Sequence, residues 1–367
     1  SELDKLLLSE PFGVKQGLLP IFYLHAYLVY QDDVALFEDG KYQPTMTEEH
    51  VERFIKKPDS FKFQLYKLEG LNGSLLAAYS KALYQGSKGN KKVLQIAQPL
   101  VKFFGELPEF TQSTRESSLL SRRTIAIREA IKMSKSPEKL IFKDLPKAMN
   151  VESITKSDSV DASQFGDILI ESLRELKEVY AKLLKHLALM LSEQLIDGRT
   201  HTLAELRKVL LGIGLTIQKL AAGPAKTFVN SLVDEKSDSD ELWLENVFVS
   251  LSRKHPSKWK DQDFAKAEAT LADLSRRFRE LQGIVQDSNY KAILKNDSDF
   301  EVIMLRSIKQ SSEPKQSVVT ISKSERKLID EEVTKVQASL KGLKGQMRMA
   351  VLAQLVELEL PESEDNE

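Results

Sequence analysis

A regular apolar pattern in residues 169–190 constrains the fold more than any other feature of this chain. Large apolar side chains recur there at alternating spacings of four and three residues: Leu169, Leu173, Leu176, Tyr180, Leu183, Leu187 and Met190. This spacing places them along one side of an α-helix, whereas a strand would need alternation at every second residue. The chain therefore contains a long amphipathic helix whose apolar side must pack against other helices.

Two further helices are expected after this seam. Thr202 and Glu205 have the spacing of a capping box, and a helix from there should end at Gly223-Pro224 and pack antiparallel to the first. A third helix, capped by Asp261, should follow the acidic loop 234–240. Its apolar residues again step by three and four: Phe264, Ala267, Leu271, Leu274, Phe278 and Leu281.

The composition agrees with a mostly α-helical protein. Hydrophobic residues make up 41% and charged residues 29%, and Leu, Ala, Lys, Glu and Arg dominate. With 367 residues the chain is long enough for two or three domains. The absence of cysteine excludes disulfides, thiolate metal sites and cysteine nucleophiles, and it favours a cytoplasmic location. We expect no signal peptide, and the apolar stretch 18–30 is too short for the about 20 residues that span a bilayer.

Strands are expected only near the two ends of the chain. Asp39-Gly40 separates two short strand-like runs and suits a type I′ hairpin turn, because both central residues of that turn need positive φ. A helix before this hairpin, a helix capped by Thr47 and a strand from Phe61 complete an α+β unit that resembles a winged helix in outline.

A second hairpin is predicted from the β-rich runs 300–305 and 317–321. Ser322 and Glu325 then form another capping box, and one long helix should follow to about residue 358. We expect five parts in all: a winged-helix-like unit at 1–70, a basic helical region at 71–150, a helical bundle at 165–296, a hairpin plus long helix at 297–360 and a disordered acidic tail at 361–367. The polar segment 151–164 is the predicted hinge.

Positive charge is concentrated in residues 81–149, which hold 14 Lys and Arg against 6 Asp and Glu although the whole chain has a net charge of −1. A helix at 121–134 should turn Ile125, Ile127, Ile131 and Met133 inward and its basic residues mostly outward. Arginine binds phosphate through paired N–H groups. The candidates for contact with phosphate or nucleic acid are Arg115, Arg122, Arg123, Arg128 and Lys132. The alternative is that these cations form salt bridges with Glu116, Glu129 and other acidic residues.

The sequence shows no pattern of an active site, and we expect no catalytic, cofactor or metal site. The five histidines lack the spacing of a metal site, and no serine nucleophile motif occurs. The glycine- and lysine-rich loop 86–92 lacks the spacing of a phosphate-binding loop. Trp243 and Trp259 each adjoin an amphipathic helix, so we interpret both as core residues rather than ligand contacts.

Several phrases resemble one family as a set. They are Pro11-Phe12-Gly13-Val14-Lys15, the run Asp33 to Gly40, Leu107 to Thr111, Leu140 to Pro146, Trp243-Leu244-Glu245 and Arg276-Arg277-Phe278. They look like the regions that follow the ATPase core in large bacterial P-loop ATPases of phage-defence and restriction-type systems. The resemblance implies a helical accessory region whose nucleotide-binding core lies elsewhere.

Three functions remain open at this point. The first is a non-catalytic accessory region that docks with, or transmits conformational change from, a P-loop ATPase. The second is a nucleic-acid-binding module that uses the basic segment 81–149. The third is a free-standing helical scaffold that binds other proteins.

Overall fold

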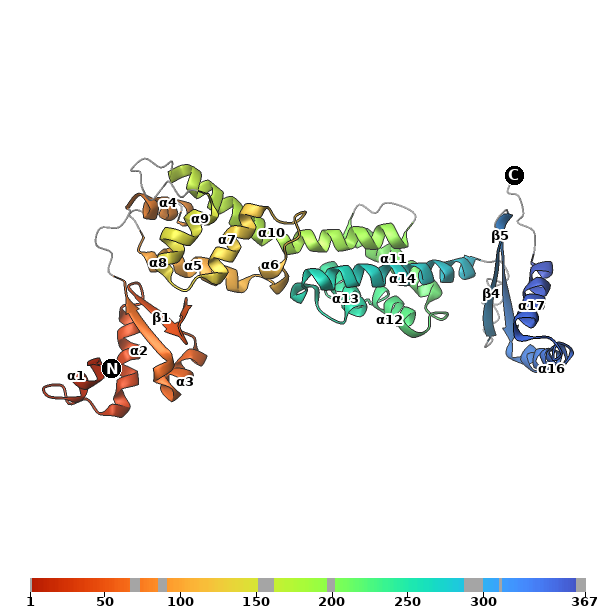
Figure 1. Cartoon of the computed structure of the whole chain (residues 1–367), viewed down its shortest axis with the longest axis horizontal. Helices are drawn as coiled ribbons and strands as arrows, with labels where there is room; N and C mark the ends of the chain where they lie inside the picture. The colour runs from red at the N-terminus through yellow and green to blue at the C-terminus, as the bar shows by residue number, and fades with distance from the viewer. Residues whose placement is uncertain are drawn as a thin grey trace. The chain divides into compact units, whose positions relative to one another are not determined.

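The computed structural model describes residues 2–66, 73–84, 91–150, 162–196, 202–286, 300–309 and 312–360, and it is mostly helical as predicted (Figure 1). These residues form two compact units, Ser1–His186 with Lys254–Ala265, and Leu187–Arg253 with Lys266–Glu367. The finer division into five parts stays a prediction, and most of the hinge segment and the acidic tail lie outside the described residues. Among the described helices, none combines the length and the apolar character needed to cross a membrane.

The first unit begins with the predicted α+β element. Its parts are α1 (Glu2–Leu8), α2 (Leu19–Val29), β1 (Val34–Glu38), β2 (Lys41–Gln43), α3 (Glu48–Lys56) and β3 (Phe61–Leu65). The strands form an antiparallel sheet in the order β2-β1-β3. The hairpin turn is confirmed, with φ of 46° at Asp39 and 76° at Gly40, and so is the cap, since the Thr47 hydroxyl accepts from the His50 N–H.

Both faces of this small sheet are covered. On one face, Tyr27 of α2 and Phe54 of α3 pack against Phe63 with ring centroids 5.7 and 5.5 Å apart. On the other face, Ala35 and Phe37 join a buried cluster with Leu94 of α5 (Val93–Glu106). The central strand β1 is therefore buried on both sides, and the sheet is fixed to the helices that follow it.

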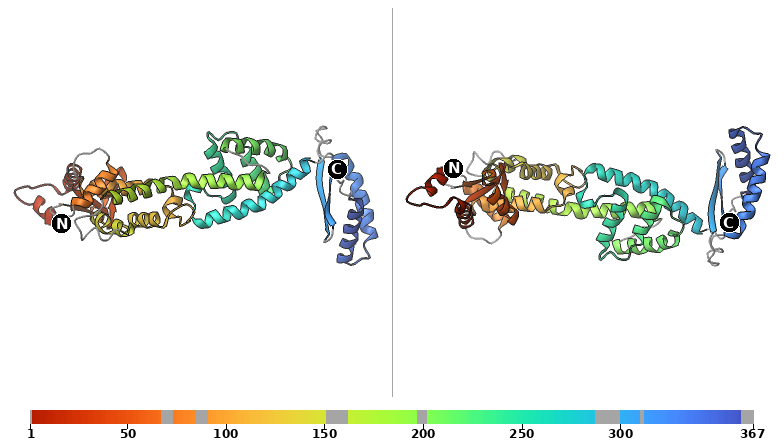
Figure 2. Two further views of the ribbon diagram at one scale, coloured as in Figure 1. Left: turned by 90° about the horizontal axis from the view of Figure 1, so that it is seen from above. Right: turned by 90° about the horizontal axis from the view of Figure 1, so that it is seen from below.

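A layer of helices completes the first unit. It contains α4 (Gly73–Leu83), α5, α6 (Glu109–Ser113), α7 (Arg122–Met133), α8 (Pro137–Lys139), the π-helical turn η3 (Leu140–Asp144), α9 (Leu145–Ala148) and the start of α10 (Ala162–Leu195). Tyr79 of α4 lies at the centre, packed edge-on against Phe165 of α10, and its hydroxyl donates to the carbonyl of Ile141 at 3.0 Å. The predicted apolar seam is confirmed, because α10 is one continuous helix (Figure 2). Leu169, Leu176 and Leu183 of the seam are buried.

The second unit contains a bundle built from the end of α10, α11 (Leu203–Ile217), α12 (Gly223–Leu232), α13 (Asp240–Ser252) and the part of α14 (Asp261–Gln286) from Lys266 onward. The Thr202 and Glu205 capping box is confirmed. Trp243 is fully buried in this bundle and donates to the Leu232 carbonyl at 3.2 Å, as expected of a core residue. Trp259, which belongs to the first unit beside the short turn η5 (Pro256–Lys258), is also fully buried.

The expected role of Gly223-Pro224 was wrong, because these residues begin α12 rather than end α11. Gly223 has a φ of 54°, and proline occupies the first turn of α12. The N–H that proline lacks is one that a first helical turn leaves unpaired in any case. The same dipeptide therefore suits a helix start as well as a helix end.

The C-terminal hairpin is confirmed as β4 (Phe300–Lys309) and β5 (Ser312–Ser322), and Val318 packs against Ile284 of α14. The Ser322 and Glu325 capping box is also confirmed. The prediction of a single long helix was wrong, since residues 323–359 form α16 (Lys323–Ser339) and α17 (Gly345–Glu359). Gly342 and Gly345 lie at the break, where glycine is a poor helix former and makes a turn less costly.

The close approach of α11 to the end of α12 can be tested at a glycine. A Cβ at Gly214 would lie 2.5 Å from Cγ1 of Val233, whereas Gly212 on the same helix has open space. We expect Gly214→Ala to lower the free energy of unfolding by about 1–3 kcal/mol because the core would be overpacked. The control Gly212→Ala should leave it unchanged or raise it by about 0.5–1 kcal/mol. Urea unfolding followed by circular dichroism measures both, and equal effects would contradict this packing.

Candidate basic groove on α7

The first turn of α7 already holds an anion. Ser121 caps the helix, and its N–H and hydroxyl donate to the Glu175 carboxylate of α10 at 2.7 and 2.8 Å. The hydroxyl of Thr124 donates to the same carboxylate. Burial raises the pKa of the Glu175 carboxyl, but the hydrogen bonds from Thr124 and Ser121 outweigh burial and bring this pKa below its usual value. The helix N-terminus, which would otherwise attract a phosphate, is therefore occupied by a side chain of the protein.

Arg128, which we expected mostly outward, is fully buried. Its Nη1 donates to the carbonyls of Thr111 and Thr114 at 2.9 and 2.6 Å, and its Nη2 lies 2.9 Å from Glu129. These carbonyls belong to the end of α6, where a helix leaves carbonyls unpaired and favours a cation. Arg128 is thus a structural clamp between α6 and α7, and the predicted salt bridge to Glu129 is confirmed for this residue.

A carboxylate also bonds the segment that follows α6. Asp261, at the start of α14, accepts from the Thr114 hydroxyl at 2.7 Å and from the Arg115 N–H at 3.1 Å. This differs from the helix cap expected of Asp261, because its carboxylate bonds a neighbouring segment instead of its own first turn. The backbone of Arg115 is fixed here while its side chain remains exposed.

The outer side of α7 lines a shallow groove with a volume of about 760 Å³. Ala126 and Ala130 form a small apolar part of its lining, and the cations Arg122, Arg123 and Lys147 are exposed along it. Asp144 is the one acidic residue among those that line it. In the part of the chain that the structure describes, neither Arg122 nor Arg123 forms an ion pair. The groove therefore carries exposed positive charge.

The five predicted cations are therefore not one site. Arg122 and Arg123 line the groove, Arg128 is buried, and Lys132 lies 3.5 Å from the Gln112 carbonyl. Met133, which we expected to face the core, is 69% exposed and lines the groove as well. Sequence reasoning missed Lys147, because its place beside α7 depends on how α9 packs.

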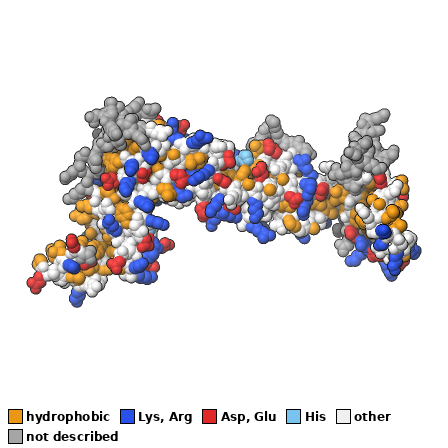
Figure 3. Space-filling view, viewed as in Figure 1, with side chains coloured by type: hydrophobic (Ala, Val, Ile, Leu, Met, Phe, Trp, Pro, Cys, Tyr) orange, Lys and Arg blue, Asp and Glu red, His pale blue; other side chains and the backbone are white. Residues whose placement is uncertain are grey.

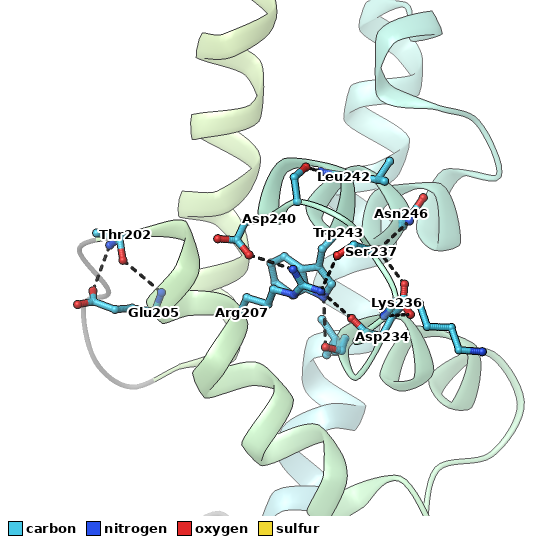
Figure 4. A network of polar contacts seen from close by, with 12 residues as sticks. Thr202, Glu205, Arg207, Asp234, Lys236, Ser237, Asp240, Leu242, Trp243 and Asn246 are labelled. Atoms are coloured by element: carbon cyan, nitrogen blue, oxygen red, sulfur yellow. Dashed lines mark hydrogen bonds and ion pairs between the residues drawn. The ribbon is translucent and has the colours of Figure 1, made fainter.

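The acidic loop before α13 is organised around one arginine (Figure 4). Arg207 of α11 donates to Asp240 at 3.0 Å and to the carbonyls of Asp234 and Ser237 at 3.1 and 3.2 Å. Its guanidinium also lies 5.9 Å from the Trp243 ring. Hydrogen bonding to the Lys236 N–H is the main cause that lowers the pKa of Asp234. The Asp234 carboxylate also accepts from the Ser237 hydroxyl at 2.8 Å, so these acidic groups bond the loop itself.

A smaller cavity of about 250 Å³ lies beside His186 in the first unit. Its polar residues include Asp261 and Glu116, but Asp261 is bonded to Thr114, and Glu116 accepts from Ser118. Over the described ranges of the chain, no three His, Asp and Glu side chains are close enough to hold a metal ion.

Apolar surface is exposed at α2. This helix carries no charged residue, yet only Leu19 and Tyr27 among its residues are buried, while Tyr23 and Leu24 are half-buried. Figure 3 shows hydrophobic side chains gathered over α1 and α2. The large exposed apolar residues on or beside α2 are Leu18, Ile21, Phe22, Leu28, Val29 and Tyr30.

Comparison with known proteins gives no family for this chain. No protein-family model, no curated protein and no solved structure matches it.

If Arg128 acts as a clamp, replacing it should lower the stability of the protein. We expect Arg128→Met to lower the free energy of unfolding by about 3 kcal/mol or more, because two buried carbonyls and Glu129 lose a charged donor. Arg122→Met, on the exposed side of the same helix, should change it by less than about 0.5 kcal/mol. Urea unfolding of both variants measures the difference. A loss for Arg122→Met as large as that for Arg128→Met would contradict the clamp.

Proposed function

We propose that this chain is a non-catalytic helical accessory region of a bacterial P-loop ATPase from a phage-defence or restriction-type system. It docks with the ATPase domain through the outer side of α2 and passes conformational change to or from it. The proposal rests on α2. Apolar residues lie on every side of this helix, but the protein covers only one side.

The two sides of α2 have the same chemistry and different surroundings. Its inner side meets the sheet, where Tyr27 packs on Phe63. On its outer side, Ile21 is 60% and Val29 is 58% exposed. A helix that is hydrophobic all round is normally buried in a larger structure. The outer side is therefore suited to contact with another protein surface.

The exposed apolar area is a large part of what a docking site needs. An aromatic side chain covers about 150–250 Å² and an aliphatic one less, so six such residues at about half exposure offer at most roughly 600 Å². This lies within the apolar patch of an ordinary monomer, about 300–600 Å². A standard protein interface uses about 800 Å² on each partner. The outer side of α2 alone is smaller than this area, and its surroundings would supply the rest.

The resemblance suggests which partner occupies this surface. Two of its phrases, residues 11–15 and 33–40, lie directly before and after α2. In the family that they resemble, the corresponding region follows an ATPase core. A P-loop ATPase domain, encoded in the same gene or beside it, is thus the partner that we propose for α2.

Binding to that ATPase tests the proposal. We expect Phe22→Asp to weaken binding measured by isothermal titration calorimetry about tenfold or more, because a carboxylate would be buried in an apolar contact. Ile55→Asp is the matched control, since Ile55 is 61% exposed on α3. Equal losses in both variants would count against docking through α2. Sustained ATP turnover by this chain alone would contradict its non-catalytic role.

A second candidate function rests on the groove of α7. Exposed Arg122, Arg123 and Lys147 border it, and the two arginines form no ion pair within the described residues. Phosphate groups of a nucleic acid suit such a set of cations. The acidic groups nearby, Asp144 in the groove and Glu175 at the helix start, make this the weaker proposal.

Salt dependence distinguishes this second function. If the groove binds nucleic acid, affinity for a DNA or RNA duplex should fall steeply as salt rises, because bound counterions are released. The double variant with Arg122→Ala and Arg123→Ala should then bind about tenfold more weakly and show a smaller salt slope. Fluorescence anisotropy measures both quantities. An affinity that is unchanged in the double variant would exclude nucleic acid as the ligand of the groove.

A further inference from the structure

The last two helices of the chain do not form a core of their own. The structure describes every residue of α16 and α17, and none of these residues is buried. Between the two helices lies an apolar groove with a volume of about 850 Å³, lined on one side by Leu328, Val333 and Val336 and on the other by Leu352. Two helices that leave such a groove open have not buried their apolar stripes.

The exposure of α17 is unusual for a helix of its composition. Its charged residues are Arg348, Glu357 and Glu359, and apolar residues occupy every side of the helix. Figure 3 shows hydrophobic side chains at this end of the chain as well. The exposed ones on α17 are Met347, Met349, Leu352, Leu355, Val356 and Leu358. A helix with this pattern belongs in the interior of a helical assembly.

The apolar area of this pair matches what a dimer needs. With Leu328, Val333 and Val336 of α16, nine large apolar side chains are between 36% and 75% exposed. An aliphatic side chain covers less than the about 150–250 Å² of an aromatic one, so these nine at about half exposure offer at most roughly 900 Å². A stable interface of standard size takes about 800 Å² from each partner. Four helices, two from each copy, would also complete the smallest common helical bundle.

We propose that a second copy of this chain covers α16 and α17, with the two α17 helices packed antiparallel about a twofold axis. The charges of α17 suit this arrangement, since Arg348, whose Nη2 donates to the Leu343 carbonyl at 3.2 Å, lies near its start and Glu359 lies at its end. Antiparallel pairing places Arg348 opposite the partner subunit's Glu359 at both ends of the contact. In the same register Leu352 faces the partner subunit's Leu355, so apolar residues meet at the centre.

This inference goes beyond the proposed function and does not rest on it. The docking surface on α2 and the dimer surface on α17 belong to different compact units. Phe22→Asp should leave the mass of the dimer unchanged, and a variant that separates the dimer should still bind the ATPase domain. Failure of one proposal is thus distinguishable from failure of the other.

Light scattering after gel filtration tests the dimer on the full chain. At micromolar concentration we expect a mass twice the monomer value of 41.5 kDa. Leu355→Arg should return the mass to that of a monomer, with a dimer dissociation constant raised at least about a hundredfold. Leu215→Arg on α11 is the matched control, because Leu215 is 55% exposed and Leu355 is 50% exposed. A monomeric native chain, or a dimer that survives Leu355→Arg, would overturn the proposal.

The charges test the antiparallel arrangement separately, with circular dichroism as a check on folding. Arg348→Glu and Glu359→Arg should each weaken the dimer about tenfold, because both reciprocal pairs become repulsive. An equimolar mixture of these two variants should recover native affinity as a heterodimer, in which every pair is again of opposite sign. A mixture no tighter than either variant alone would overturn the antiparallel register.

Discussion

The covering of apolar helix sides is the constraint on which this structure depends. The long helix α10 supplies one apolar seam to both compact units: Leu169 joins the core around Tyr79 in the first, and Leu191 is buried in the second. In the first unit, residues of α4, α5 and α7 join Phe165 and Leu169 of this helix in one buried cluster. Where no neighbour covers the apolar side of a helix, as at α2 and α17, apolar surface is left exposed. We therefore interpret helices with covered apolar sides as structural, and we propose the exposed apolar sides as interfaces.

Several charged side chains bond the backbone of the protein itself. Glu175 satisfies the start of α7, Arg128 satisfies the end of α6, and Arg207 gathers the acidic loop before α13. In each case a charged side chain bonds backbone groups that helix ends and turns leave unpaired.

Local signals in the sequence predicted local structure well. Asp39-Gly40 and the capping boxes at Thr202 and Ser322 each depend on residues within three positions, so their outcome is independent of the rest of the fold. Features that depend on distant packing could not be predicted in this way. Arg128 lies between Ile127 and Ile131 on the buried side of α7, and only the carbonyls of α6 make that position tolerable for a charge. Lys147 joins the groove for a similar reason, since its place is determined by the packing of α9.

The central claim is that exposed apolar helices here are interfaces, and that α17 and α2 meet different partners. Hydrogen–deuterium exchange of the purified chain, followed by mass spectrometry at a low and a high protein concentration, tests it most directly. The account predicts that amides of α17 exchange more slowly at the high concentration, while those of α2 exchange at the same rate in both. Exchange in α17 that does not depend on concentration would contradict it.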